Sequence, residues 1–296
     1  MLIDLGRCHP VSSRFESDVH GFEKIIHLWH QIQECRYEQI QIDWQHISWL
    51  DANLCSPFGA ILYKAGRNLN SIEFINLPRD IEVILSKNNF LSIYGRARRK
   101  DIYGTTIEYK RFETQDDRYF AAYIQKHLTG KGIPEMTPGL QKKFLENIFE
   151  IFHNAVIHSR TKLGIFSCGQ FFPRKTHLDF TITDLGIGFC QNVRQALELT
   201  LSPEKAIEWA MKEGNTTRKD AIPGGLGLKL LFNFIQKNKG RIQIVSDRGF
   251  WEYHNRRTST QLFSEPFPGS IVNMQINTAD PCSYGLAPEI HLADIF

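Results

Sequence analysis

The chain has 296 residues, 42% of them hydrophobic and 12% aromatic, which is enough for a sizeable core and for two domains of ordinary size. With 35 lysines and arginines against 32 aspartates and glutamates, its net charge of +3 does not require a polyanionic partner. Six scattered cysteines form no C-x-x-C pair, which argues against a zinc site and against a disulfide framework. Because no apolar N-terminal segment and no window of membrane-spanning length is present, we expect a cytoplasmic protein without a membrane partner.

Residues 1–94 read as an alternating α/β segment, which we interpret as a first domain. Apolar residues at helical spacing follow Gly21, and the run from Gln39 to Trp44 alternates like a half-buried strand. Asp51 is placed to begin a second helix, and Pro78 a third. The pattern predicts helices at residues 21–35, 52–68 and 79–88, and strands at residues 39–44 and 71–76.

This order of a strand, Trp49-Leu50-Asp51, a helix, a strand and a helix resembles the STAS domain, the fold of anti-sigma-factor antagonists. In that family the loop between the strand and the following helix carries an aspartate that is followed by a phosphorylatable serine. Here Ala52 and Asn53 follow Asp51, and the nearest hydroxyl is that of Ser56. The resemblance therefore implies a docking or dimerisation domain, through which the chain binds a protein partner or itself, rather than a phosphorylation switch. An unrelated small α/β domain is the alternative.

Residues 95–137 are polar and rich in glycine, and we interpret them as a connection between domains that includes a strand at residues 105–111 and a short helix at residues 116–127. Their basic run, residues 96–100, favours a solvated linker over a nucleic-acid patch, because no aromatic residue interleaves it. Nucleic acid is accordingly not an expected partner.

A second domain is expected at residues 138–280, followed by a tail at residues 281–296. Thr137-Pro138 begins a long helix that runs through His158. The remaining elements follow from period and turn signals. They are strands at residues 164–172 and 176–183, a polar helical segment at 191–222, a helix at 229–237, strands at 241–246, 250–254 and 270–276, and a turn at 247–249.

One face of the long helix carries three polar side chains that are each four residues apart. Glu150, Asn154 and His158 stand one above another at this spacing. A carboxylate, a carboxamide and an imidazole offer a base, an oxygen ligand for a hard cation and a switchable donor. On its own such a stripe is more typical of the solvent-facing side of an amphipathic helix.

Two glycine clusters downstream give the stripe a chemical context. Asp184 ends a strand, and Gly186 and Gly188 allow a close backbone approach or a positive φ beside a carboxylate that can accept hydrogen bonds from a ring such as adenine. Glycines at 224, 225 and 227 precede a helix, whose free backbone N–H groups suit phosphates. With Asn154 as a cation ligand, these parts predict a pocket for a magnesium nucleotide.

Two other nucleotide motifs are excluded by spacing. The dinucleotide fingerprint G-x-G-x-x-G fails, because Gln191 stands where the third glycine belongs. The P-loop motif fails as well, because Lys229 is followed by Leu230 rather than by serine or threonine.

At these residues the chain, over residues 138–278, resembles the GHKL ATPases, the family of gyrase, the mismatch-repair ATPases, histidine kinases and anti-sigma serine kinases. The order of the motifs along the chain carries the resemblance. The matching residues are Glu150, Asn154, Ala155 and His158 in the N box, Asp184, Gly186 and Gly188 in the first glycine box, Gly225, Leu226 and Gly227 in the second, and Gly269-Ser270 before the closing strand.

The resemblance implies a two-layer α/β sandwich, a mixed sheet with helices on one face, that binds ATP and Mg²⁺. Asn154 would hold Mg²⁺, Asp184 would bind the adenine amino group, and Glu150 would orient or deprotonate the attacking group. Residues 189–224 would form a lid over the phosphates, although a polar surface loop is the alternative. His158 is open to two interpretations, a phosphate contact or a cap on a helix carbonyl. The residues implied to contact the nucleotide are Asn154, His158, Asp184, Gly186, Gly188, Thr216, Thr217, Arg218, Gly224, Gly225, Leu226, Gly227 and Ser270.

The first hypothesis is thus a cytosolic regulatory protein that hydrolyses ATP or transfers its γ-phosphate to a protein, in the manner of a serine/threonine anti-sigma kinase. An autophosphorylating histidine kinase is disfavoured, because residues 95–137 hold one histidine, His127, and too little periodic helix for an acceptor hairpin. The alternative is a non-catalytic switch in which the nucleotide controls dimer or partner association. A third hypothesis is nucleic-acid binding through residues 96–100.

Overall fold

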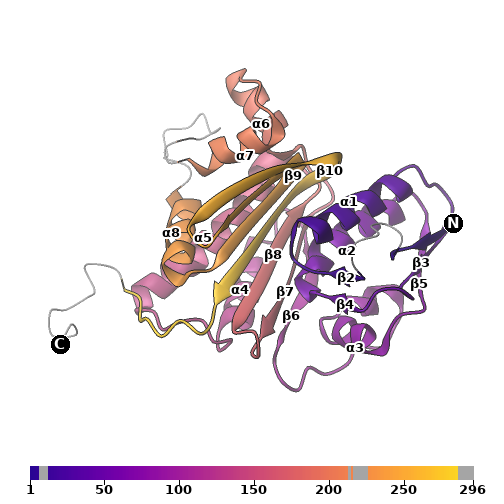
Figure 1. Ribbon diagram of the computed structural model, residues 1–296, viewed down its shortest axis with the longest axis horizontal. Coiled ribbons are helices and arrows are strands. Elements are labelled where there is room, and N and C mark those ends of the chain that lie inside the picture. Colours follow the sequence, from indigo (N-terminus) through magenta and orange to yellow (C-terminus); the bar gives the residue numbers. More distant parts are fainter. Residues whose placement is uncertain (7–12, 213–214, 216–225, 286–296) are drawn as a thin grey trace.

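The computed structural model describes residues 1–6, 13–212, 215 and 226–285, with the backbone alone at residues 226–230. The chain is a mixed α/β protein with a small parallel sheet and a larger antiparallel one (Figure 1). None of the helices in these ranges combines the length and the apolar character needed to cross a membrane.

The N-terminal part is built on a three-stranded parallel sheet in the order β1-β3-β5. Strands β1 (Leu2–Asp4), β3 (Gln39–Asp43) and β5 (Ser71–Ile75) are joined through helices α1 (Val19–Ile32) and α2 (Cys55–Gly66), since parallel neighbours require a crossover. The Asp18 carboxylate caps α1 by accepting from the N–H of Gly21 at 2.8 Å. Helix α3 (Arg79–Lys87), the paired strands β2 (Arg14–Phe15) and β4 (Trp49–Leu50), and the 3₁₀ helices η1 (Ala52–Leu54) and η2 (Leu91–Tyr94) complete this part.

The predicted helices and longer strands of this part are confirmed to within a few residues at each end. Strand β1 was missed, because three residues are too few for a periodic signal.

The larger sheet has the strand order β6-β7-β8-β10-β9. Its strands are β6 (Thr106–Phe112), β7 (Ile165–Phe172), β8 (His177–Asp184), β9 (Arg241–His254) and β10 (Arg257–Asn277), and each described pairing is antiparallel. The expected mixed sheet is therefore wrong, because β7 and β8 form one hairpin, β9 and β10 form another, and β6 joins the edge antiparallel to β7. Strand β6 and helix α4 (Asp117–Leu128), predicted within the connecting segment, are thus integral parts of this layered unit.

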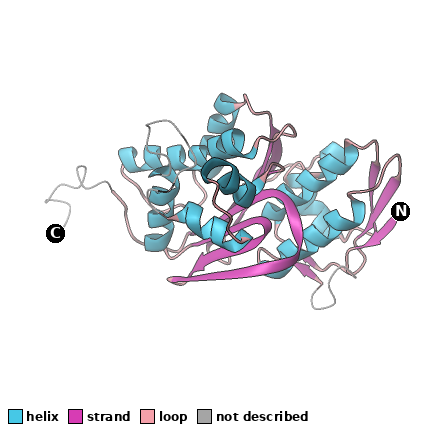
Figure 2. Ribbon diagram, turned by 90° about the horizontal axis from the view of Figure 1, so that it is seen from above, coloured by secondary structure: helices cyan, strands magenta, loops and turns pink. Residues whose placement is uncertain are grey.

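A single long, curved hairpin replaces the three strands and the turn predicted between residues 241 and 276 (Figure 2). Asp247 has φ of +53° and lies at a register shift inside β9, so the predicted turn at residues 247–249 is wrong and is a bulge. The chain reverses instead at Asn255 and Arg256, whose φ angles of +51° and +63° suit a tight two-residue turn.

One face of the larger sheet is covered by α4, α5 (Pro138–Ser159) and α8 (Leu226–Asn238). Helix α5 begins as predicted, with Pro138 in its first turn and the Thr137 hydroxyl accepting from the N–H of Leu140. Helices α6 (Gly188–Leu197) and α7 (Pro203–Met211) lie at the end of the sheet where β8 stops (Figure 1).

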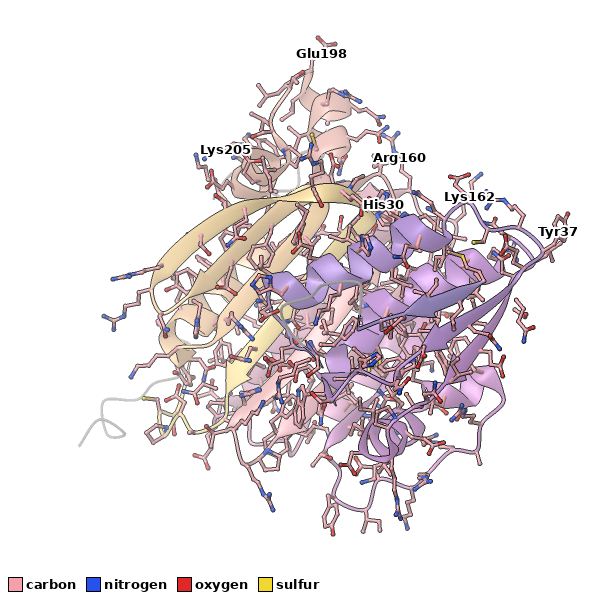
Figure 3. The ribbon with its side chains drawn as sticks, turned by 45° about the vertical axis from the view of Figure 1, so that its right-hand side comes forward. His30, Tyr37, Arg160, Lys162, Glu198 and Lys205 are labelled. Atoms are coloured by element: carbon pink, nitrogen blue, oxygen red, sulfur yellow. The ribbon has the colours of Figure 1, made fainter. Side chains whose placement is uncertain are left out.

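The other face of this sheet is covered by the N-terminal part, with α1 against β10 and α2 and η1 against β7 and β8 (Figure 1). A single apolar cluster runs from the N-terminal helices into the sheet and includes Phe22, Phe166 and Phe250. Within the larger unit, the helices α4, α5 and α8 cover one face of the sheet, as expected, and the second face is covered by the N-terminal part. The two parts pack directly on each other, and His30 of α1 lies beside β10, with its Nε2 2.9 Å from the carbonyl oxygen of Pro266 (Figure 3).

Candidate functional site

The polar stripe of α5 has the predicted form. Phe144, Ile148, Ile151 and Phe152 bury the opposite side of the helix in the core. Glu150, Asn154 and His158 are each half-buried, so they lie neither in the core nor fully in solvent. The Glu150 carboxylate makes no hydrogen bond or ion pair with the described residues. This leaves a carboxylate available one turn before the carboxamide of Asn154.

Asp184 lies at the last position of β8, and the alternation of the strand points it to the helical side of the sheet. Phe180 and Ile182 share this face and pack in the cluster that contains α5. The Asp184 carboxyl accepts from the N–H of Gly186 at 2.9 Å, is hydrogen-bonded to the Ser159 side chain, and is 5% exposed. Burial raises the pKa of Asp184 to about 7, and these hydrogen bonds oppose the rise. It is a buried carboxyl group at a strand end whose charged form is disfavoured by burial, and a group of this kind is a candidate for a functional site.

The end of α5 and the loop after β8 are joined directly through Ser159, the residue after His158. The carbonyl of Ser159 accepts from the N–H of Ile187 at 2.9 Å. A Cβ on Gly186 would lie 2.0 Å from this same carbonyl oxygen, so glycine is required there by close approach. The structure therefore brings the predicted N box and the first predicted glycine box together.

Gly188 and Ser270 meet at a second junction on this loop. Gly188 has φ of +70°, and a Cβ there would lie 2.6 Å from the Ser246 hydroxyl. That hydroxyl accepts from the N–H of Phe189 at 2.9 Å, lies 3.2 Å from the carbonyl oxygen of Gly269, and is 3.3 Å from the Ser270 hydroxyl. Ser270 pairs with Asp184 in the β10–β8 register, which places both at one edge of the site.

Ser159 and Ser246 are structural members of the site that the sequence did not indicate. Both act on backbone groups of the loop after β8, from other elements of the fold. Ser159 directly follows the N-box stripe, which was the one available signal. Ser246 had none, because a serine inside a strand has no distinctive pattern.

The second glycine box is described only in part. Leu226 and Gly227 begin α8, which packs along α5, so a helix N-terminus is present where it was predicted. Gly224, Gly225 and the three expected lid residues, Thr216, Thr217 and Arg218, lie outside the described residues. Their predicted contacts with phosphates stay predictions.

The residues present are compatible with an Mg²⁺ ion that is coordinated jointly by the protein and by a bound phosphate, rather than by protein side chains alone. Among the described residues, no three His, Cys, Asp or Glu side chains are grouped as a metal site. Asn154 can supply one neutral oxygen, and Mg²⁺ commonly takes only one or two protein ligands together with substrate phosphates and water. A metal at this position would therefore arrive with a phosphate ligand.

An open pocket of about 390 Å³ adjoins the loop after β8 on its other side, toward α2. Lys64, Arg194 and Asp247 line it together with the backbone of Gly186 and Gly269. Of the predicted nucleotide-site residues, Gly186 lines this pocket, whereas Glu150, Asn154 and Asp184 do not, so the pocket adjoins the predicted site without including its polar side chains.

The loop that resembles a STAS phosphorylation loop is buried inside the molecule. Asn53 and Ser56 are fully buried, and the Ser56 hydroxyl lies 3.0 Å from the carbonyl oxygen of Phe166 and 2.8 Å from the Thr183 hydroxyl. Ser56 is therefore inaccessible to a kinase in this fold. This face of the N-terminal part is used within the chain, so a partner would bind elsewhere on it.

Comparisons of the chain with protein-family models and with curated proteins find no match. The GHKL and STAS resemblances thus rest on the sequence motifs and on the order of the elements along the chain.

Proposed function

We propose that the chain binds Mg-ATP in a GHKL-type site between α5, the loop after β8 and the start of α8, and that it hydrolyses ATP or transfers its γ-phosphate to a protein. The observation that carries the proposal is the junction at Ser159. It fixes the end of the α5 stripe against the glycine loop that holds the buried Asp184 carboxyl.

Asp184 would recognise the adenine end of the nucleotide. A buried carboxyl discriminates well, because an unpaired buried polar group is costly and an amino group that donates to it relieves that cost. Its raised pKa means that a donor on the ligand favours the ionised form, so binding and deprotonation are coupled.

Asn154 and Glu150 would act at the phosphate end. Asn154 would hold Mg²⁺, which when bound neutralises phosphate charge and stabilises the charge that develops during phosphoryl transfer. Glu150, one helical turn away and half-buried, is suited to orient or deprotonate water or a protein hydroxyl. Its half-burial leaves room for an approaching acceptor.

The experiment is a titration of Mg-ATP into the purified chain by calorimetry. We expect Asp184→Asn and Asn154→Ala each to weaken binding about tenfold or more, because each removes a contact in a partly dry site. Asp179→Asn is the matched control for the first, since Asp179 is buried in the same strand on the opposite face. Gln141→Ala, an exposed carboxamide on the same helix, controls the second. Binding that is unchanged in both site variants overturns the proposal.

Turnover is measured separately as phosphate release and as transfer to protein. Glu150→Gln should abolish both while leaving ATP binding intact, if Glu150 activates the acceptor. Tight ATP binding without either product in the wild-type chain would instead support the alternative function, a nucleotide-dependent switch.

A further inference from the structure

A second pocket, of about 560 Å³, lies at the outer edge of the larger sheet, far from Asp184. Thr106, at the start of the edge strand β6, pairs with Gln170, whereas Phe112 at its end pairs with Ile165, which in turn pairs with Asp184. At about 3.3 Å per residue, the start of β6 is therefore roughly 20 Å from the level of Asp184 along the strands. We call this cavity the basic pocket.

Cationic side chains from separate segments of the chain converge on the basic pocket. They come from α3, from the segment before β6, from α4 and from the turn after α4. The six are Lys87, Arg98, Arg99, Lys100, Lys126 and Lys131. The run at residues 98–100, interpreted from the sequence as part of a solvated linker, is thus one wall of a cavity.

The two carboxylates in the basic pocket each have a hydrogen-bond partner, although Oδ1 of Asp101 is buried without one among the described residues. Glu108 accepts from Arg98, and Asp101 accepts from the N–H and the hydroxyl of Thr106 at 2.7 and 2.8 Å. No described carboxylate forms an ion pair with Arg99, Lys100 or Lys126, although all three are exposed. Most of the positive charge in the cavity is therefore not neutralised by a carboxylate of the described chain.

Two buried basic groups line the pocket, and neighbouring cations lower the pKa of one of them, His127. Lys131 is only 9% exposed and donates from Nζ to the carbonyl of Gly104, and burial lowers the pKa of its ammonium while Asp101 opposes the change. His127 has its pKa lowered to about 4, first by burial and then by the nearby Lys126, Lys131 and Arg98, while Glu108 opposes the change. Neighbouring cations that make each other's charge unfavourable are stabilised by an anion between them.

We propose that the basic pocket binds a compact polyanion that carries two or more phosphate groups. The cavity has the volume of a small-molecule site, larger than a single phosphate requires. Arginine and lysine side chains are the donors that phosphates prefer, and six of them around one concavity match several phosphates rather than one. The site is separate from the proposed nucleotide site and would give the chain a second, regulatory ligand.

The shape and the lining favour a compact anion over a single-stranded nucleic acid. No Phe, Tyr or Trp side chain is among the described residues that line the pocket, whereas sequence-independent strand binders stack bases on such rings. The ring of Tyr103, beside the pocket, is 81% exposed, with the Lys87 ammonium 5.6 Å from its centroid. One such ring is fewer than the series of aromatic platforms on which strand binders stack successive bases.

The test is calorimetric titration of inorganic tripolyphosphate, without Mg²⁺, into the full chain carrying Asn154→Ala. This background variant and the absence of Mg²⁺ weaken binding at the proposed nucleotide site, so failure of one site can be told from failure of the other. Lys100→Glu with Lys126→Glu should weaken the Kd about tenfold or more, because two exposed donors become repulsive. Lys143→Glu with Arg257→Glu changes the net charge equally at exposed positions outside the pocket, and we expect it to change the Kd by less than about threefold.

Three results would overturn the inference. One is the absence of saturable tripolyphosphate binding. Another is an equal loss of affinity in both double variants, which would show only the effect of net charge. The third is a single-stranded oligonucleotide that binds more tightly than tripolyphosphate and loses affinity in the pocket variant alone, which would assign the surface to nucleic acid. Thermal unfolding of each variant checks that the exposed substitutions leave the fold intact.

Discussion

The two faces of the larger sheet are buried equally well but in different ways. Toward α4, α5 and α8 the contacts are apolar, with Phe112, Phe120 and Phe152 packed ring against ring. Toward the N-terminal part, the apolar cluster that contains Phe22, Phe166 and Phe250 is accompanied by polar side chains of the sheet that form a buried hydrogen-bonded network. The first face is stabilised by area and shape, while the second requires each donor to meet its own acceptor.

The polar network is centred on Asn53 of η1. Its Nδ2 lies 2.8 to 3.1 Å from oxygens of Ser17, Thr181 and Asn273, and Asn273 in turn donates to Gln243 at 2.8 Å. Apolar side chains can slide over one another at small cost, but these groups lose their partners if the N-terminal part shifts. The network thus favours one orientation of the N-terminal part on the sheet, while the apolar clusters on both faces supply stabilisation that depends little on exact register.

The largest effect is expected from a substitution in the apolar contacts between the larger sheet and the helices α4, α5 and α8. Phe152 is fully buried and its ring stacks on Phe120 at 4.2 Å between centroids. Phe152→Ala should lower the free energy of unfolding by about 3–5 kcal/mol, since it removes a large side chain and leaves a cavity. Urea denaturation measures the loss. Tyr119→Ala, at a 69% exposed position of α4, should cost less than about 0.5 kcal/mol. A small loss in Phe152→Ala would show that this face is loosely packed.

The next largest effect is expected from a substitution in the polar network between the larger sheet and the N-terminal part. Asn53→Leu should lower the free energy of unfolding by about 2–4 kcal/mol, because it leaves buried polar groups on both sides of the contact without a hydrogen-bond partner. Hydrogen exchange should show a larger loss of protection in β3, within the N-terminal part, than in β8, within the sheet. Equal losses in the two strands would mean that the two parts unfold only as one unit, and the network would then have no separate role in holding them together.

These faces also explain what the sequence could and could not predict about the fold. The alternation in residues 177–183 correctly predicted β8 and its apolar face. Asp179, Thr181 and Thr183 fit a solvated face equally well, yet each is almost fully buried. A polar side chain has the same pattern whether its partner is water or another polar side chain, so the second layer was not predictable from periodicity.

Turn-forming residues were also an incomplete guide, because they report only the local preference of the chain. Asp247-Arg248-Gly249 is typical of a turn, but long-range pairing with β10 carries the strand through it as a bulge. The reversal occurs at Asn255 and Arg256, where no glycine indicates it. In the candidate site, Asn154 and Asp184 were predicted from the spacing and order of the motifs, whereas Ser159 and Ser246 were missed because they contact backbone groups far along the chain.

A smaller effect is expected in the pH dependence of stability, which distinguishes the two faces of β8 through Asp184 and Asp179. Asp184 is buried on the helical face with its pKa raised to about 7, so the folded state holds a proton that the unfolded chain loses near pH 4. Stability associated with this group is therefore full at low pH and is lost as pH rises from about 4 to 7. Relative to wild type, Asp184→Asn should gain about 2–3 kcal/mol in the free energy of unfolding between pH 5 and pH 8. Urea denaturation at both pH values measures it.

Asp179→Asn is the control for this pH effect. Asp179 is equally buried on the opposite face, where it accepts from Gln275 at 2.9 Å and lies 3.3 Å from the ring of His177. We expect no comparable gain in this variant. A gain of the same size in both would assign the pH dependence to the strand as a whole and would remove the special status of Asp184.

The smallest expected effect measures how strongly one hydrogen bond of the polar face couples the two parts. Ser56 and Thr183 lie 2.8 Å apart between their hydroxyls, one on α2 and one on β8. Ser56→Ala and Thr183→Val should each cost about 1–2 kcal/mol, and the double variant less than their sum, because no hydroxyl is then left without its partner. A double-mutant cycle by urea denaturation should give a coupling energy of about 0.5–1.5 kcal/mol. Strict additivity would show that the two hydroxyls are satisfied independently, the Ser56 hydroxyl by the carbonyl of Phe166, and that the orientation of the N-terminal part depends on Asn53 alone.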